Sequence, residues 1–211
     1  DEGGPVRYKA ALMSLHPRSI AILGAGGNAG RLLIDHLSED SAVERIIAVD
    51  SRSLPDLPSK ARQIELRLDS ADLTDHLSNL IDEEDLDTLV YLGYLAELPG
   101  IQENQAAEVE RVIEALQNRP VPKVIFASST TVYGALPGDP AHLDEDTPLA
   151  TDPSSEWVRD KIRCEELYRD FLLDSDAVVT VLRFGLPLGP NVDNFMSGYM
   201  SRKAVPIVDG L

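Results

Sequence analysis

The chain has 211 residues with 36 acidic and 19 basic side chains, and its formal net charge of −17 argues against nucleic acid or an anionic membrane as a partner. Hydrophobic residues make up 43% of the chain, as in globular proteins, and no apolar run approaches the roughly 20 residues that span a membrane. The single cysteine, Cys164, excludes an internal disulfide and a cysteine-based metal cluster, and no metal site is predicted.

Residues 1–18 precede the first predicted element and are interpreted as an N-terminal arm. They lack the apolar stretch of a secretory signal peptide. Together with the low cysteine content, this favours a cytoplasmic location.

Short apolar runs alternate along the chain with stretches of helical periodicity. Strands are predicted at 19–24, 45–50, 63–68, 87–92, 123–129 and 177–185, and helices at 28–40, 72–81, 101–117 and 153–173. For the last helix, Asp152 and Pro153 supply a cap and a first-turn proline. Strands that alternate with helices predict an α/β fold with a doubly wound parallel sheet, the Rossmann fold.

The segment GAGGNAG (24–30) follows the first predicted strand and opens the first predicted helix. In this context Gly24 permits a tight turn, Gly27 permits the backbone to approach a pyrophosphate, and Gly30 permits close packing of the helix. The helix that begins at Asn28 presents free N–H groups and a positive dipole to the phosphates. The motif therefore predicts dinucleotide binding. Its glycines also fit a Gly-x-Gly spacing at 24 and 26, which leaves the subfamily open.

Asp50 ends the second predicted strand, about 20 residues beyond the last glycine, where an acid accepts hydrogen bonds from the adenosine ribose. A carboxylate at this place repels a 2′-phosphate, so NAD is favoured over NADP as the cofactor. Arg52 keeps NADP open, because an arginine two residues further on could receive that phosphate. The alternative for Asp50 is an ordinary strand-end acid in a turn.

Polar residues also follow two other predicted strands. Asp69, after the third strand, could accept from the adenine amino group or serve only as a turn residue or helix cap. The fifth strand ends in ASSTTVYG (127–134), which places Ser128 and Ser129 at the edge where parallel sheets bind ligands. Their hydroxyls could donate to a substrate or satisfy their own backbone.

Taken together, these residues resemble the extended short-chain dehydrogenase/reductase family, the NAD-dependent epimerase/dehydratase group. The resemblance runs from about residue 19 to 190. It comprises the glycine motif, Asp50, Asp69, Asn104, SSTTVYG at 128–134, LDEDTPL at 143–149, the helix with Lys161, and RFGLPLGP at 183–190. The SSTTVYG segment followed by an acidic, proline-containing loop is fairly specific to this family.

The resemblance also assigns roles to residues in the second half of the chain. Ser129 matches the family's catalytic serine or threonine, and Lys161 matches the lysine of its Tyr-x-x-x-Lys pair, which also reaches the nicotinamide ribose. The position of the catalytic tyrosine is occupied by Trp157. An indole N–H only donates and does not titrate, so Trp157 cannot replace the tyrosine as acid and base.

The resemblance implies an NAD(P)-dependent enzyme that acts by hydride transfer, with a modified proton relay, on a nucleotide-sugar or another carbonyl or alcohol substrate. The alternative is a catalytically inactive NAD(H)-binding sensor or regulatory module. Residues 19–190 would form the NAD(P)-binding Rossmann domain, and 191–211 the start of a substrate-binding lobe that is incomplete or absent. By analogy with related proteins, two copies would pair as a homodimer through the helices at 101–117 and 153–173.

Overall fold

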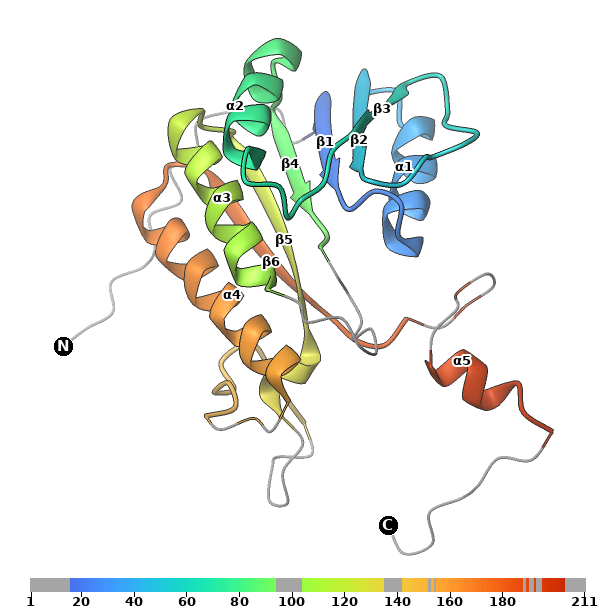
Figure 1. Ribbon diagram of the computed structural model, residues 1–211, viewed down its shortest axis with the longest axis vertical. Coiled ribbons are helices and arrows are strands. Elements are labelled where there is room, and N and C mark those ends of the chain that lie inside the picture. The colour runs from blue at the N-terminus through green and yellow to red at the C-terminus, as the bar shows by residue number, and fades with distance from the viewer. Residues whose placement is uncertain are drawn as a thin grey trace, which may run out of the picture.

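Six parallel strands form one sheet in the order β3-β2-β1-β4-β5-β6 (Figure 1). The computed structural model describes residues 16–93, 104–134, 142–151, 153, 155–187, 189, 192 and 195–203. The strands are β1 (Ser19–Leu23), β2 (Arg45–Asp50), β3 (Ala61–Glu65), β4 (Thr88–Tyr91), β5 (Lys123–Ser129) and β6 (Val178–Phe184). The parallel sheet predicted from the alternation of strands and helices is confirmed.

Helices cover both faces of this sheet. One face carries α1 (Asn28–Glu39), and the other carries α2 (Leu73–Glu84), α3 (Gln105–Asn118) and α4 (Glu156–Asp174) side by side (Figure 1). A 3₁₀ turn, η1 (Thr130–Tyr133), follows β5, and the short helix α5 (Phe195–Met200) lies apart from the sheet. Across the described residues, every helix is too short or too polar to cross a membrane. The arrangement is the predicted Rossmann fold.

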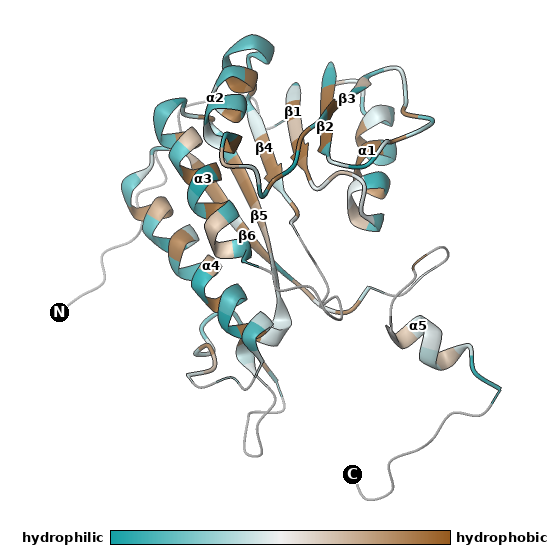
Figure 2. Cartoon of the chain, in the orientation of Figure 1, coloured by the Kyte–Doolittle hydropathy of each residue, from teal (hydrophilic) through white to brown (hydrophobic). Residues whose placement is uncertain are grey.

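Each face of the sheet has its own apolar core. Beneath α2, α3 and α4, the ring of Phe126 stacks on Tyr168 with centroids 4.0 Å apart and meets Phe171 edge-on at 6.2 Å. Beneath α1, Ile22 of β1 packs with Ile34 of the helix. Figure 2 shows hydrophobic strands inside and hydrophilic residues on the outer faces of the helices. Strands β1, β2 and β4 are therefore buried, whereas the edge strand β6 leaves Val178, Val181 and Leu182 exposed.

The third strand begins and ends earlier than predicted. Although alternating polarity predicts a strand at 63–68, β3 stops at Glu65. Glu65 pairs with Asp50, the last residue of β2, and the hydrogen bond from the N–H of Leu66 to the Asp50 carbonyl at 3.3 Å follows at the end of that strand. Leu66 and Leu68 continue past the strand and still pack against the apolar core, which explains why their alternation resembles that of a strand.

The predicted start of the last helix is also wrong. Ser155 has an extended backbone, so α4 begins at Glu156 and Pro153 lies before the helix; Asp152 is outside the described residues. Residues 101–103, where α3 is predicted to start, are outside the described residues as well. At the start of α3, Asn104 caps the helix, because its side chain accepts a hydrogen bond from the backbone N–H of Ala107 at 3.3 Å.

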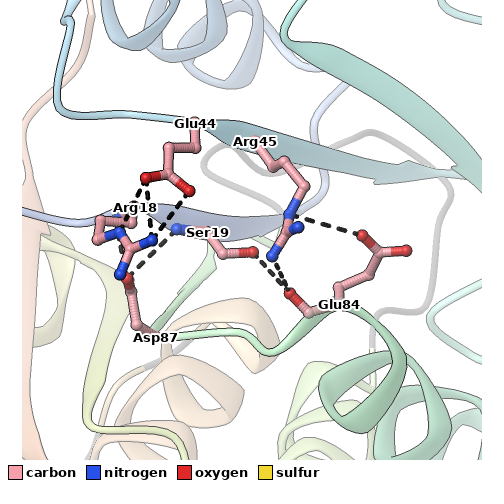
Figure 3. Close-up of polar contacts among 6 residues, drawn as sticks. All are labelled: Arg18, Ser19, Glu44, Arg45, Glu84 and Asp87. Carbon is pink, nitrogen blue, oxygen red and sulfur yellow. Dashed lines mark hydrogen bonds and ion pairs between the residues drawn. The ribbon is translucent and has the colours of Figure 1, made fainter.

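Polar contacts fix the starts of β1 and β2 at the amino-terminal edge of the sheet (Figure 3). The Asp87 carboxylate accepts hydrogen bonds from the backbone N–H groups of Arg18 and Ser19 at 2.8 and 3.3 Å. The carbonyl of Glu84 accepts from the Ser19 hydroxyl at 2.9 Å and from Arg45 at 2.8 Å. The end of α2 and the residues that follow it therefore hold both strands in register.

Replacing Asp87 with alanine tests this edge. The change leaves two backbone N–H groups without their shared acceptor, so we expect the free energy of unfolding to fall by about 1–3 kcal/mol in urea denaturation. Glu83→Ala, an exposed change on α2, is the control and should cost less than about 0.5 kcal/mol. Equal losses in the two variants would show that the Asp87 contacts do not stabilise the edge.

Candidate functional site

A cleft of about 640 Å³ lies at the carboxyl-terminal edge of the sheet, where the segments that follow β1, β2 and β3 meet. With the exception of Lys161, the predicted cofactor-binding residues all line it: Gly24, Gly27, Asn28, Gly30, Asp50, Arg52 and Asp69. Phe184, Pro187 and Val192 line it from the segment at and after the end of β6. The structure thus brings together residues that are widely separated in the sequence.

The turn after β1 needs glycine at two positions for reasons internal to the fold. Gly24 has a φ of +82°, and a side chain there would lie 3.2 Å from the backbone nitrogen of Gly93. A Cβ at Gly30 would lie only 2.5 Å from the carbonyl oxygen of Ala25. The tight turn predicted at Gly24 and the close packing predicted at Gly30 are therefore both present.

Gly27 has no comparable internal reason to be glycine. It is the residue before α1, its φ of −72° suits any residue, and a Cβ there would meet only the carbonyl oxygen of Gly24 at 3.6 Å. The first turn of α1, which Asn28 opens, contains no acidic side chain to offset the helix dipole. The space at Gly27 and the free N–H groups beside it fit an anionic group such as a pyrophosphate.

Asp50 connects the glycine turn to the end of β2. Its carboxylate is 6% exposed and accepts hydrogen bonds from the backbone of Gly26 at 2.8 Å and from the backbone of Arg52 at 2.9 Å. The Arg52 guanidinium, 67% exposed, pairs with the same carboxylate at 3.0 Å. A Cβ at Gly26 would lie 2.8 Å from Asp50, so the alternative Gly-x-Gly spacing also has a structural basis.

The surroundings of Asp50 keep it ionised. Burial opposes its ionisation, but the hydrogen bonds from Arg52 and from the Gly26 backbone outweigh burial and lower the pKa of the Asp50 carboxyl below its ordinary value. An ionised carboxylate is an acceptor only, with lone pairs on both oxygens. Asp50 therefore suits hydroxyl donors in the cleft and repels anions.

Asp69 lies at the far end of the same cleft and is paired with an arginine. Arg67 donates to the Asp69 carboxylate from Nε at 2.9 Å and from Nη2 at 2.6 Å, and these hydrogen bonds lower the pKa of the Asp69 carboxyl. Arg67 also lines the cleft, a position that no motif in the sequence marks. A ligand that donates a hydrogen bond to Asp69 would therefore meet a carboxylate that already accepts from Arg67.

Lys161 and Trp157 are not among the described residues that line the cleft. Lys161 is 1% exposed, and its ammonium donates to the side-chain carbonyl of Gln105. The ammonium also lies 5.5 Å from the centre of the Trp157 ring, within cation–π range. The indole N–H of Trp157 is buried and finds no acceptor among the described residues.

Ser129 ends β5 with its side chain nearly buried. Its hydroxyl oxygen accepts hydrogen bonds from the backbone N–H of Thr131 at 3.3 Å and from the Thr131 hydroxyl at 3.0 Å. Its own proton is used in neither bond. Ser128 differs, because its hydroxyl donates to Glu165 at 2.6 Å.

A polar network that sequence patterns did not reveal braces the segment after β5. Arg183 of β6 pairs with Glu165 of α4 at 2.7 Å and donates to the Tyr133 hydroxyl at 2.6 Å. Tyr133 in turn donates to the carbonyl of Asp144 at 2.8 Å. Tyr133, Asp144 and Arg183 each lie in a segment of the family resemblance, and Glu165 follows Lys161 by one helical turn on the buried face of α4, but none of these patterns shows that the four side chains meet.

The sequence profile described as the NAD dependent epimerase/dehydratase family matches residues 20–210. An uncharacterised protein of Mycobacterium tuberculosis (strain H37Rv) is 26% identical over 204 residues, which cover 92% of this chain and 54% of that protein. UDP-glucuronic acid 4-epimerase from Bacillus cereus, solved in complex with NAD, has a TM-score of 0.64 at 22% identity, over 79% of this chain and 56% of that one. MoeE5 in complex with UDP-glucose and NAD has a TM-score of 0.57 at 29% identity, over 77% and 52%.

These comparisons agree with the observed fold, and they match only part of the length of the related proteins. Both solved structures share the Rossmann arrangement, and both were solved in complex with NAD. The chain spans about half the length of the relatives it matches most fully.

The two helix-start glycines provide a test of the site's construction. Gly30→Ser places an atom against the Ala25 backbone, so we expect a loss of about 1–3 kcal/mol in the free energy of unfolding. Gly27→Ser meets no close atom and introduces a favoured helix-cap residue, so its stability should stay within about 0.5 kcal/mol of the wild type. Chemical denaturation of the two variants measures this difference, and similar stabilities would contradict it.

Proposed function

Because the chain belongs to the NAD-dependent epimerase/dehydratase family, we propose that its cleft binds NAD and that the protein takes part in hydride transfer with a nucleotide-sugar or another carbonyl or alcohol substrate. The observation that carries the proposal is the convergence of the glycine turn, Asp50 and Asp69 on one cleft. Bound NAD would supply the hydride acceptor or donor. The NAD complexes of structurally similar proteins support this choice of cofactor.

The cleft residues divide the binding of NAD between them. The open space at Gly27 and the N-terminal N–H groups of α1 receive the pyrophosphate, because helix N-termini favour anions. The ionised Asp50 accepts from the ribose hydroxyls, and Asp69 accepts from the adenine amino group. Arg52 is paired with Asp50 rather than left as a separate cation, which supports NAD over NADP.

Proton transfer is assigned to Ser129, with Lys161 as the residue that holds the nicotinamide ribose. The two bonds from Thr131 leave the Ser129 proton for an acceptor on the substrate or for a water molecule. Trp157 contributes only an N–H donor, since an indole does not titrate near neutral pH. The Ser129 hydroxyl and a water molecule therefore transfer the proton in place of the family's tyrosine phenol.

A second function, an NAD(H)-responsive sensor without turnover, is favoured by one observation. The indole of Trp157 cannot titrate, and the neighbouring Lys161 is 1% exposed and is not among the described residues that line the cleft. Such a protein would bind the cofactor and pass its binding to a partner. Pairing of two copies through α3 and α4 stays a prediction.

Calorimetry with NAD and NADP tests cofactor binding. We expect NAD to bind more tightly than NADP, and Asp50→Ala to weaken NAD at least tenfold, because a charge-assisted hydrogen bond is lost. Asp50→Ala should also reduce the ratio of the affinity for NAD to the affinity for NADP. Asp35→Ala, exposed on α1 outside the cleft, is the matched control and should bind like the wild type. An absence of heat with both cofactors would overturn the proposal.

Nicotinamide absorbance with a panel of nucleotide sugars separates the enzyme from the sensor. For the enzyme we expect turnover by the wild type and a loss of about 100-fold in kcat for Ser129→Ala, the usual size of an acid–base contribution. Trp157→Tyr adds a titratable group and should raise the rate. A sensor would show NAD binding without turnover in the wild type, in Ser129→Ala and in Trp157→Tyr.

A further inference from the structure

Gln105 is a buried polar residue that no sequence motif marks. It is the first residue of α3 and is 1% exposed. Its backbone N–H donates to the Asp160 carboxylate at 2.9 Å, and its side-chain carbonyl accepts from the ammonium of Lys161. A buried carboxamide is costly unless it is hydrogen-bonded; the contact with Lys161 satisfies its carbonyl oxygen, whereas its Nε2 finds no acceptor among the described residues.

The other side of the Gln105 carboxamide lies against the cleft wall. A Cβ built on Gly93 would lie 1.8 Å from Nε2 of Gln105, a distance at which two atoms cannot coexist. Gly93 itself lines the cleft and packs against the turn at Gly24. A continuous packed path therefore leads from the glycine turn through Gly93 and Gln105 to Lys161.

This path limits what Lys161 can do. An ammonium has three N–H donors on a flexible stem of four carbons, so its direction is set by its acceptors and its neighbours. The Gln105 carbonyl takes one of these donors, and the Trp157 ring bounds the ammonium at 5.5 Å. These two contacts thereby restrict the direction of the ammonium.

We propose that Gln105 is a positioning residue that aims the Lys161 ammonium at the ribose of the bound dinucleotide, and that glycine at position 93 is required because the Gln105 carboxamide occupies the space of a side chain there. The proposal rests on the proposed function, since it needs NAD in the cleft. Gln105 touches neither cofactor nor substrate and acts through Lys161.

The first experiment measures the lysine without any cofactor. Gln105→Met keeps the size of the side chain and removes the acceptor, so acylation of Lys161, followed by mass spectrometry, should become about fivefold faster than in the wild type. Gln105→Glu keeps an acceptor and should be no faster than the wild type. Gln117→Met, the same change at an exposed position of α3, is the matched control and should leave the rate unchanged.

The second experiment measures NAD affinity by calorimetry in a double-mutant cycle. If Gln105 acts through Lys161, Gln105→Met and Lys161→Met should each weaken NAD by about 5- to 10-fold, and the double variant should be no weaker than Lys161→Met alone. A merely structural role for Gln105 predicts additive losses. Additivity would therefore overturn the proposal, even where Gln105→Met lowers stability.

The third experiment tests the contact with Gly93. Gly93→Ala should weaken NAD at least tenfold, because the new Cβ displaces the Gln105 carboxamide. The added change Gln105→Ala should restore part of that affinity; the restoration is incomplete because the φ of +52° at position 93 still strains an alanine. A double variant as weak as Gly93→Ala alone would contradict the steric part of the proposal.

Failure of the proposed function is distinguishable from failure of this inference. Wild-type protein that binds no NAD overturns both the proposed function and the aiming role of Gln105. Wild-type protein that binds NAD while Gln105→Met leaves acylation of Lys161 unchanged overturns only the role of Gln105.

Discussion

Parallel pairing of β1 with β2 on one side and with β4 on the other is the constraint on which the site depends. Leu23 lies beside Val49 and beside Tyr91, so the three strands end at the same level and the segments after them meet. The N–H groups of Gly24 and Ala25 both donate to the Val49 carbonyl, at 2.9 and 3.2 Å. The floor of the cleft is therefore made by main-chain hydrogen bonds. It does not depend on the side chains that line the cleft.

The fold and the cofactor half of the site follow from local patterns. Alternating strands and helices, a glycine turn and an acid at a strand end are short-range signals, and the parallel sheet then brings Asp50 to the turn without further information. The orientation of Lys161 is a different problem, since its partner Gln105 is 56 positions away and no periodicity connects them. The end of β3 was also out of reach, because it is set by the length of β2.

The two halves of the candidate site differ in how their polar groups are satisfied. Around Asp50 a buried carboxylate is surrounded by donors from Gly26 and Arg52, so its charge is compensated within the fold. Around Trp157 a buried indole N–H finds no acceptor among the described residues, and the ammonium of Lys161 beside it donates to the Gln105 carboxamide. The polar groups of the first half are thus compensated within the fold, whereas the second half contains one buried donor without an acceptor in the described part of the chain.

Asp160 and Lys161, adjacent residues of α4, hold the main chain and the side chain of the same residue of α3. A rotation of α4 by one residue, about 100°, would break both contacts at once. Sliding or turning one helix against the other would therefore cost a main-chain and a side-chain contact together, so the position of α3 fixes the helix that carries Lys161.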